Sequence, residues 1–261
     1  GRSPAEDVTP SCCEPRVPRR FRYLAGRTVD RAVIGVGRGG RLDSTNVLAR
    51  ALSVLTHVGR DHTDMLGDTL DAIAREKAGI IKPGTPALSA VTPDEAQAAI
   101  AEVAATQDAP LHRLDDEATW TTHRSGLTGS AFSLDTPVRH YDRLSLSLAG
   151  PHQQRNAALA VRAAELTFLA GEDDASADAA VRDGLGDVRG HTGFHGRLDV
   201  LGNEPLLVVD VGHNPPAIAA TLDTVAPVVA GRGGTLHVCL NAVRGKQLDE
   251  TARLLAAHDA V

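Results

Sequence analysis

Lys77 occupies a position that needs a chemical explanation. The stretch GDTLDAIAREKAGIIKPG, residues 67–84, predicts a helix from about Thr69 whose buried face follows the i, i+3, i+4, i+7, i+8 spacing. The residues on that face are Leu70, Ile73, Ala74, Lys77 and Ala78. Either the lysine stem covers apolar surface while the charge reaches solvent near the helix C-terminus, or the amine is desolvated, loses its proton and can react.

His62 is a second candidate for chemistry. It lies in the loop HVGRDHTDMLGDT, between an apolar run that predicts a strand and the helix of Lys77, and Asp61 and Asp64 flank it. Loops at the carboxyl ends of parallel strands are where α/β proteins bind ligands. The alternative is a solvated histidine in a polar surface loop.

The stretch VVDVGHNPP holds a third group of candidates. Asp210 ends a predicted buried strand, and His213 and Asn214 precede a predicted helix with Pro215 at its first position. An aspartate there suits a ribose hydroxyl or a metal-bound phosphate, and the helix N-terminus suits an anion. The alternative is that Asp210 and Asn214 only stabilise the turn.

Two phosphate-loop or dinucleotide patterns are only superficial. Gly35, Gly37 and Gly40 match the spacing G-x-G-x-x-G, but turn-forming residues (RLDSTN) follow where the motif requires a helix. The stretch RGKQ, residues 244–247, lacks both the preceding glycine and the following Ser or Thr of a phosphate loop. An oxidoreductase with a dinucleotide site is therefore disfavoured.

The composition limits the partners. The 261 residues are 42 % hydrophobic and 23 % charged, with a formal net charge of −6 and no apolar run of membrane-spanning length. We expect neither a nucleic acid nor a membrane as partner. Three cysteines, Cys12, Cys13 and Cys239, fit neither a disulfide framework nor a zinc site, so the expected compartment is the cytoplasm.

The elements that must position these residues alternate between strand and helix. After a leader rich in Pro, Arg and Ser, which we expect to be disordered over residues 1–20, the pattern predicts an α/β fold. The predicted strands are 29–37, 51–59, 84–91, 205–210 and 235–243, and antiparallel strands at the edge of the first sheet lie within 119–150. The predicted helices lie within 69–82, 92–108, 152–171, 171–190 and 211–229.

Five motifs together resemble the dihydrofolate synthase / folylpolyglutamate synthase family, a branch of the Mur ligases. They are VGRGGRLDSTNV, GRDHTDMLGDTLDAIAREKAGIIKPG, GPHQQRNAALA, FHGRLDV and DVGHNPPA, in the family's order. The resemblance implies a mostly parallel Mur-ligase-like ATPase domain over 21–190, without its N-terminal phosphate-loop part. A partial Rossmann-like glutamate-ligase domain is implied over 191–261.

The resemblance also implies roles for individual residues. Lys77 matches a lysine that carbon dioxide converts to a carbamate, a carboxylate that helps to position Mg2+; His62 resembles a magnesium ligand. Asn156 resembles the residue that contacts adenine, and Arg197 the arginine that reaches the nucleotide phosphates. Asp210 and His213 match the family's nucleotide-contacting pair.

The activity implied by the resemblance is ADP-forming amide synthesis in folate metabolism. ATP phosphorylates a carboxylate of dihydropteroate or a reduced folate, and the amino group of L-glutamate attacks the acyl phosphate. Magnesium and arginine neutralise charge during the transfer. We expect a monomer that binds only small molecules.

The leading hypothesis is a ligase of which this chain is an incomplete or degenerate copy, because the chain departs from the family in three ways. The chain contains no G-x-x-x-x-G-K-[ST] loop, and Gly35 stands where the family has a magnesium-binding Glu. It covers about half of the family's C-terminal domain, where NAVRGKQ replaces a more acidic segment. The alternative to a ligase is a non-catalytic relative that keeps the fold and binds at most a nucleotide or a partner; the missing loop and Gly35 favour this alternative.

Overall fold

The computed structural model describes residues 16–27, 29–37, 39–59, 69–241 and 248–258. The chain forms two compact units, one up to His112 and one from Arg113 onward. None of the helices within the described ranges is long and apolar enough to cross a membrane. The domain boundary predicted after residue 190 concerns family domains and stays a prediction.

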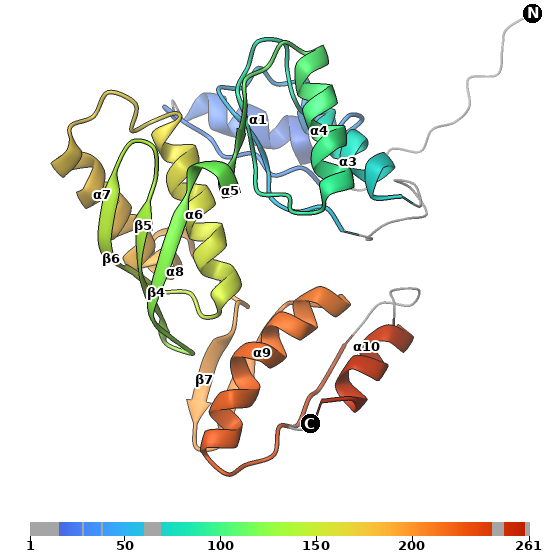
Figure 1. Cartoon of the computed structure of the whole chain (residues 1–261), viewed down its shortest axis with the longest axis vertical. Helices are drawn as coiled ribbons and strands as arrows, with labels where there is room; N and C mark the ends of the chain where they lie inside the picture. The colour runs from blue at the N-terminus through green and yellow to red at the C-terminus, as the bar shows by residue number, and fades with distance from the viewer. Residues whose placement is uncertain (1–15, 28, 38, 60–68, 242–247, 259–261) are drawn as a thin grey trace, which may run out of the picture. The chain divides into compact units, whose positions relative to one another are not determined.

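The first unit contains a three-stranded sheet. Its helices α3 and α4 pack against each other (Figure 1). Its sheet has the order β1-β2-β3, and β1 and β2 are parallel. The elements are α1 (Arg16–Gly26), η1 (Ser44–Val47), β1 (Ser53–Leu55), α3 (Leu70–Ala78), β2 (Ala87–Ser89), α4 (Asp94–Thr106) and β3 (Leu111–Arg113).

The residues at the N-termini of α3 and α4 stabilise the starts of these helices. The Thr69 side chain accepts a hydrogen bond from the Ala72 N–H at 3.1 Å and so caps α3. Helix α4 follows Pro93 and carries Asp94 and Glu95 in its first turn, where negative charge is favoured. The apolar faces of α3 and α4 pack with β1 and β2 in one hydrophobic core.

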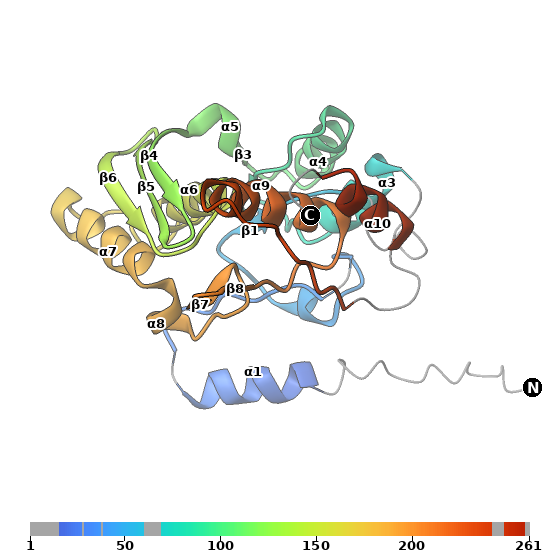
Figure 2. The ribbon, with the colours of Figure 1, turned by 90° about the horizontal axis from the view of Figure 1, so that it is seen from below.

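The second unit contains an antiparallel sheet with the order β4-β5-β6 and a two-stranded sheet of β7 and β8. Helix α6 packs on β5, and α7 on β6 (Figure 2). The elements are α5 (Leu114–Glu117), β4 (Thr119–Gly126), β5 (Gly129–Asp135), β6 (His140–Leu146), α6 (Pro151–Glu165), α7 (Asp174–Gly186), α8 (Val188–Thr192), β7 (Asp199–Asn203), β8 (Leu206–Val209), α9 (Pro215–Gly231) and α10 (Leu248–Ala256).

Several expectations about the strands are wrong. Residues 29–37 form no strand, because no described residue pairs with their backbone, and Val33 is 93 % exposed. Residues 235–241 are likewise not a strand. The antiparallel strands form their own sheet rather than the edge of the first one. Residues 16–20 of the predicted disordered leader are helical, as part of α1; residues 1–15 lie outside the described ranges.

Candidate functional site

Lys77 lies on the packed face of α3, as its spacing predicted. Ile73, Ala74 and Ala78 on this face are fully buried, whereas the Lys77 side chain is half-buried. No described residue accepts a hydrogen bond from its ammonium group. The Lys77 stem thus lies on the apolar side of the helix, beside fully buried residues.

His57 is a titratable neighbour of Lys77 that was not predicted from the sequence. The imidazole lies two residues beyond β1 and keeps contact with solvent. Its pKa is lowered, first by the protein packed around it, which desolvates the charged form, and then by the positive charge of Lys77. A histidine just past the carboxyl end of a strand was the signal that could have found it.

The segment of Gly40 and Arg41 packs directly on the C-terminal half of α3. A Cβ atom at Gly40 would lie 2.6 Å from the carbonyl oxygens of Glu76 and Lys77, so only glycine fits there. The Arg41 N–H donates to the Glu76 carbonyl at 3.0 Å, and the Asn46 side-chain amide donates to the Gly79 carbonyl at 3.1 Å. These bonds satisfy carbonyls at the end of the helix.

This packing accounts for the glycine spacing without a dinucleotide. The Gly37 N–H donates to the Asp43 carboxylate at 3.0 Å, and the same side chain caps the short helix η1. Gly35 is exposed, and a Cβ there would meet nothing within 4 Å. Gly37 and Gly40 therefore serve a turn and a close approach of two backbones, which explains their spacing without a dinucleotide site.

The described residues do not bring together a cluster of metal-binding side chains. Within the described ranges, no group of three or more His, Cys, Asp and Glu side chains is placed to hold a metal ion. His62, the predicted ligand, lies outside those ranges, and Gly35 brings no carboxylate. A test of this predicted ligand set therefore depends on residues outside the described ranges.

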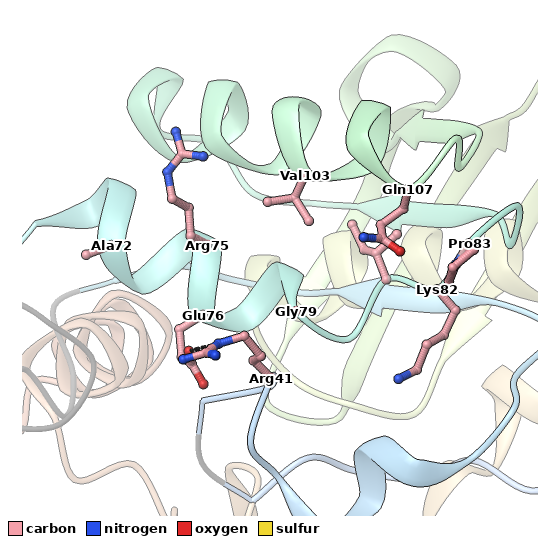
Figure 3. A pocket seen from close by; sticks show the side chains of 10 residues that line it. Arg41, Ala72, Arg75, Glu76, Gly79, Lys82, Pro83, Val103 and Gln107 are labelled. Carbon is pink, nitrogen blue, oxygen red and sulfur yellow. Dashed lines mark hydrogen bonds and ion pairs between the residues drawn. The ribbon is translucent and has the colours of Figure 1, made fainter.

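A hollow of about 720 Å3 lies between α3 and α4 (Figure 3). Arg41, Arg75 and Lys82 line it. Their charges are engaged: Arg41 pairs with Glu76 at 3.2 Å, Arg75 pairs with Asp71 and Glu102, and the Lys82 ammonium donates to the Asn46 carbonyl at 2.7 Å. The hollow therefore offers little unpaired positive charge to an anion.

The remaining predicted residues lie in the second unit. Asp210 directly follows β8. Its carboxylate accepts hydrogen bonds from the N–H groups of Leu198, at 3.0 Å, and Gly212, at 2.6 Å. The Arg197 guanidinium lies 4.9 Å from the centre of the Phe194 ring, which supports it from one side. Both side chains are half-buried.

Asn156 and His213 lie on two helical segments of the same unit. Asn156 is exposed on α6, and its amide donates to the Gln153 side chain at 3.1 Å. His213 precedes α9 and its Nδ1 lies 3.1 Å from the Val211 carbonyl, so Nδ1 is the protonated nitrogen of this contact. Asn214 caps α9 by accepting from the Ala217 N–H at 3.0 Å, as predicted.

His152 connects these residues. It is the second residue of α6, one turn before Asn156, and the charges of Asp210 and Arg197 both act on its imidazole. Asn156, Arg197 and Asp210 are therefore brought into one neighbourhood of the second unit. His152 belongs to the motif GPHQQRNAALA, but no pattern in the sequence alone marks it as a functional residue.

Comparison with known proteins identifies the class. The Mur ligase middle domain matches residues 14–164. The chain therefore belongs to the Mur ligase family.

Its relatives are the folate ligases of that family. It is 38 % identical over 228 residues to the dihydrofolate synthase/folylpolyglutamate synthase of Bacillus subtilis, covering 87 % of this chain and 51 % of the relative. It is 36 % identical over 196 residues to the folylpolyglutamate synthase of Lacticaseibacillus casei, covering 75 % and 45 %. The chain thus spans about half the length of the curated relatives it matches.

Solved structures agree with the sequence comparisons. A folylpolyglutamate synthase in complex with AMPPCP and folate superimposes with a TM-score of 0.79 at 32 % identity, over 92 % of this chain and 57 % of that one. The Thermotoga maritima folylpolyglutamate synthase gives 0.77 at 28 % identity, over 94 % and 54 %. The predicted Mur-ligase-like α/β fold is confirmed.

Proposed function

We propose that this chain is part of an ATP-dependent ligase that adds L-glutamate to dihydropteroate or a reduced folate. The observation that carries the proposal is the grouping of Arg197 and Asp210 beside the start of α6, the helix of Asn156. The similarity to folylpolyglutamate synthases, one of them in complex with AMPPCP and folate, supports it.

In the proposed reaction, a carboxylate of the pterin substrate accepts the γ-phosphate of ATP and ADP leaves. The amino group of glutamate then attacks the acyl phosphate, loses a proton and displaces phosphate, which leaves an amide. Each step develops negative charge on phosphate oxygens, so the residues that bind the nucleotide must supply positive charge and hydrogen-bond donors.

The second unit can supply those groups. The guanidinium of Arg197, supported on one side by Phe194, can bind phosphate oxygens through paired N–H groups. Asp210 is held by two backbone N–H groups and keeps lone pairs for a ribose hydroxyl. The Asn156 amide suits the donor and acceptor edge of adenine, and the proposal gives His213 a further contact with the nucleotide.

Lys77 has a different proposed role, in the first unit. Its half-buried amine carries a carbamate formed from carbon dioxide, which turns a cation into a carboxylate. In the family, such a carboxylate and a histidine, here His62, position Mg2+, which neutralises phosphate charge. Among the described residues, no group of three or more His, Cys, Asp and Glu side chains adds further ligands to this pair.

The proposal also covers the domain organisation, the oligomeric state and the cellular compartment of the protein. Residues 21–190 are part of a central ATP-binding domain, and 191–261 are part of a C-terminal glutamate-ligase domain. The protein acts as a monomer in the cytoplasm on small-molecule substrates, without nucleic acid or membrane as partner.

Nucleotide binding tests the proposal directly. We expect the purified chain to bind ADP and AMPPCP, measured by calorimetry, and Arg197→Ala to lower the affinity about tenfold or more, because a hydrogen bond to a charged group is lost. Arg124→Ala removes an exposed arginine of β4 and serves as the matched control. Equal affinity in the wild type and Arg197→Ala would contradict the assigned role.

A further inference from the structure

The His152 side chain is exposed at the start of α6 and has no assigned function. No described residue forms a hydrogen bond with either of its ring nitrogens. An imidazole without internal partners is not needed to satisfy the local backbone, so a structural role as a cap does not explain it.

The position of the ring is nevertheless fixed by its surroundings. A Cβ atom at Gly150 would lie 2.6 Å from Cε1 and 2.9 Å from Nδ1 of His152, and 3.1 Å from Oγ1 of Thr224 on α9. Gly150 has a φ of 99°, a conformation that other residues rarely adopt. Glycine therefore lets the imidazole fold back against the backbone, with its Nδ1–Cε1 edge on Gly150.

The ring lies where the proposed nucleotide site needs a polar group. His152 and Asn156 are four residues apart on α6 and so share one face of the helix. The pKa of His152 is lowered mainly by desolvation; the charge of Asp210 opposes this and that of Arg197 adds to it. The neutral imidazole that results has one N–H donor and one acceptor.

We propose that His152 contacts the ribose–phosphate part of a nucleotide whose base lies at Asn156 and whose phosphates lie at Arg197. This inference rests on the proposed function and adds a specific residue to it. A neutral imidazole can donate to a phosphate oxygen or pair with a sugar hydroxyl without adding a further charge to a site that already holds Arg197 and Asp210.

The test combines NMR with affinity measurements on the whole chain. In 15N-labelled protein, titration with ADP is expected to shift the imidazole signals of His152, while those of His140, an exposed histidine on β6, stay in place. His152→Ala is expected to weaken ADP binding about tenfold. His152→Gln, whose amide can replace one ring nitrogen, is expected to restore part of the affinity, and His140→Ala is the matched control.

The outcomes separate the two proposals. Unshifted His152 signals, or ADP affinity of His152→Ala within twofold of a wild type that binds ADP, would overturn the role of His152 and leave the nucleotide site in place. A wild-type chain that binds neither ADP nor AMPPCP would overturn both. Adenosine binding that is equally weakened by His152→Ala would assign the contact to the ribose rather than the phosphates.

Discussion

Lys77 lies on the buried face of α3 and beside the imidazole of His57, and only the first of these could be predicted from the sequence. The buried face of α3 was predictable, because helical periodicity is a local property of the chain. The neighbouring imidazole of His57 was not, because its approach to Lys77 depends on how β1 and α3 pack. The same holds for His152, because its proximity to Asp210 and Arg197 depends on the packing of segments that are far apart in the sequence.

The proposed carbamate on Lys77 can be tested by 13C NMR. In the presence of 13C-bicarbonate and Mg2+, we expect a carbamate carbon signal that is absent from Lys77→Gln, since only an unprotonated, accessible amine adds carbon dioxide. Lys82→Gln is the matched control: the Lys82 ammonium donates to the Asn46 carbonyl and should contribute no such signal. A bare amine at saturating bicarbonate would refute the assignment.

Among the elements, helices were predicted better than strands. Helices α3, α4, α6 and α9 carry their own start signals, such as Thr69 and Asn214, and lie where the sequence placed them. A strand needs a hydrogen-bonded neighbour that its own sequence does not contain. For this reason the apolar runs 29–37 and 235–241 were wrongly predicted as strands.

The contact between the Gly40 segment and α3 gives a stability test. Gly40→Ala would place a methyl group 2.6 Å from two carbonyl oxygens of α3, so we expect it to lower the free energy of unfolding by about 1–3 kcal/mol. Gly35→Ala, five residues earlier in open space, is expected to change it by less than about 0.5 kcal/mol. Denaturant titration measures both.

Equal stability of the two variants would show that the close approach at Gly40 relaxes at no cost. A loss confined to Gly40→Ala would instead confirm that this glycine, which the sequence pattern associated with a dinucleotide, is retained for packing on α3. The distinction concerns backbone geometry, which the G-x-G-x-x-G spacing alone cannot reveal.

Across the whole molecule, each unit has its own internal framework. The first unit packs an apolar core between its sheet and helices. The second also buries a charged network in which Glu165 accepts from the Tyr141 hydroxyl at 3.0 Å and pairs with Arg162 at 3.2 Å. Arg162 also pairs with Glu117 at 2.7 Å. Such a network costs stability if one partner changes its charge.

This network predicts a pH dependence of stability. Desolvation, followed by the charge of Glu165, raises the pKa of Tyr141 above its ordinary value. The neutral phenol therefore stabilises the folded state fully below about pH 10, and this contribution is lost as the pH rises above that value. We expect the stability difference between the wild type and Tyr141→Phe to shrink over this range, measured by denaturant unfolding.

The other tyrosine provides the control for this experiment. Tyr23 is 61 % exposed on α1, so the free energy of unfolding of Tyr23→Phe is expected to decline above pH 10 as that of the wild type does. If the wild type and Tyr141→Phe keep a constant stability difference above pH 10, the phenol of Tyr141 ionises equally well in the folded and unfolded states.

The hydrogen bond from the Arg41 N–H to the Glu76 carbonyl has a further consequence for how the Lys77 region opens. This amide proton can exchange with deuterated solvent only when the loop lifts from the end of α3. Its exchange rate therefore reports the frequency of that local opening, one residue before Lys77. The lysine itself need not be altered or labelled to follow how often its surroundings come apart.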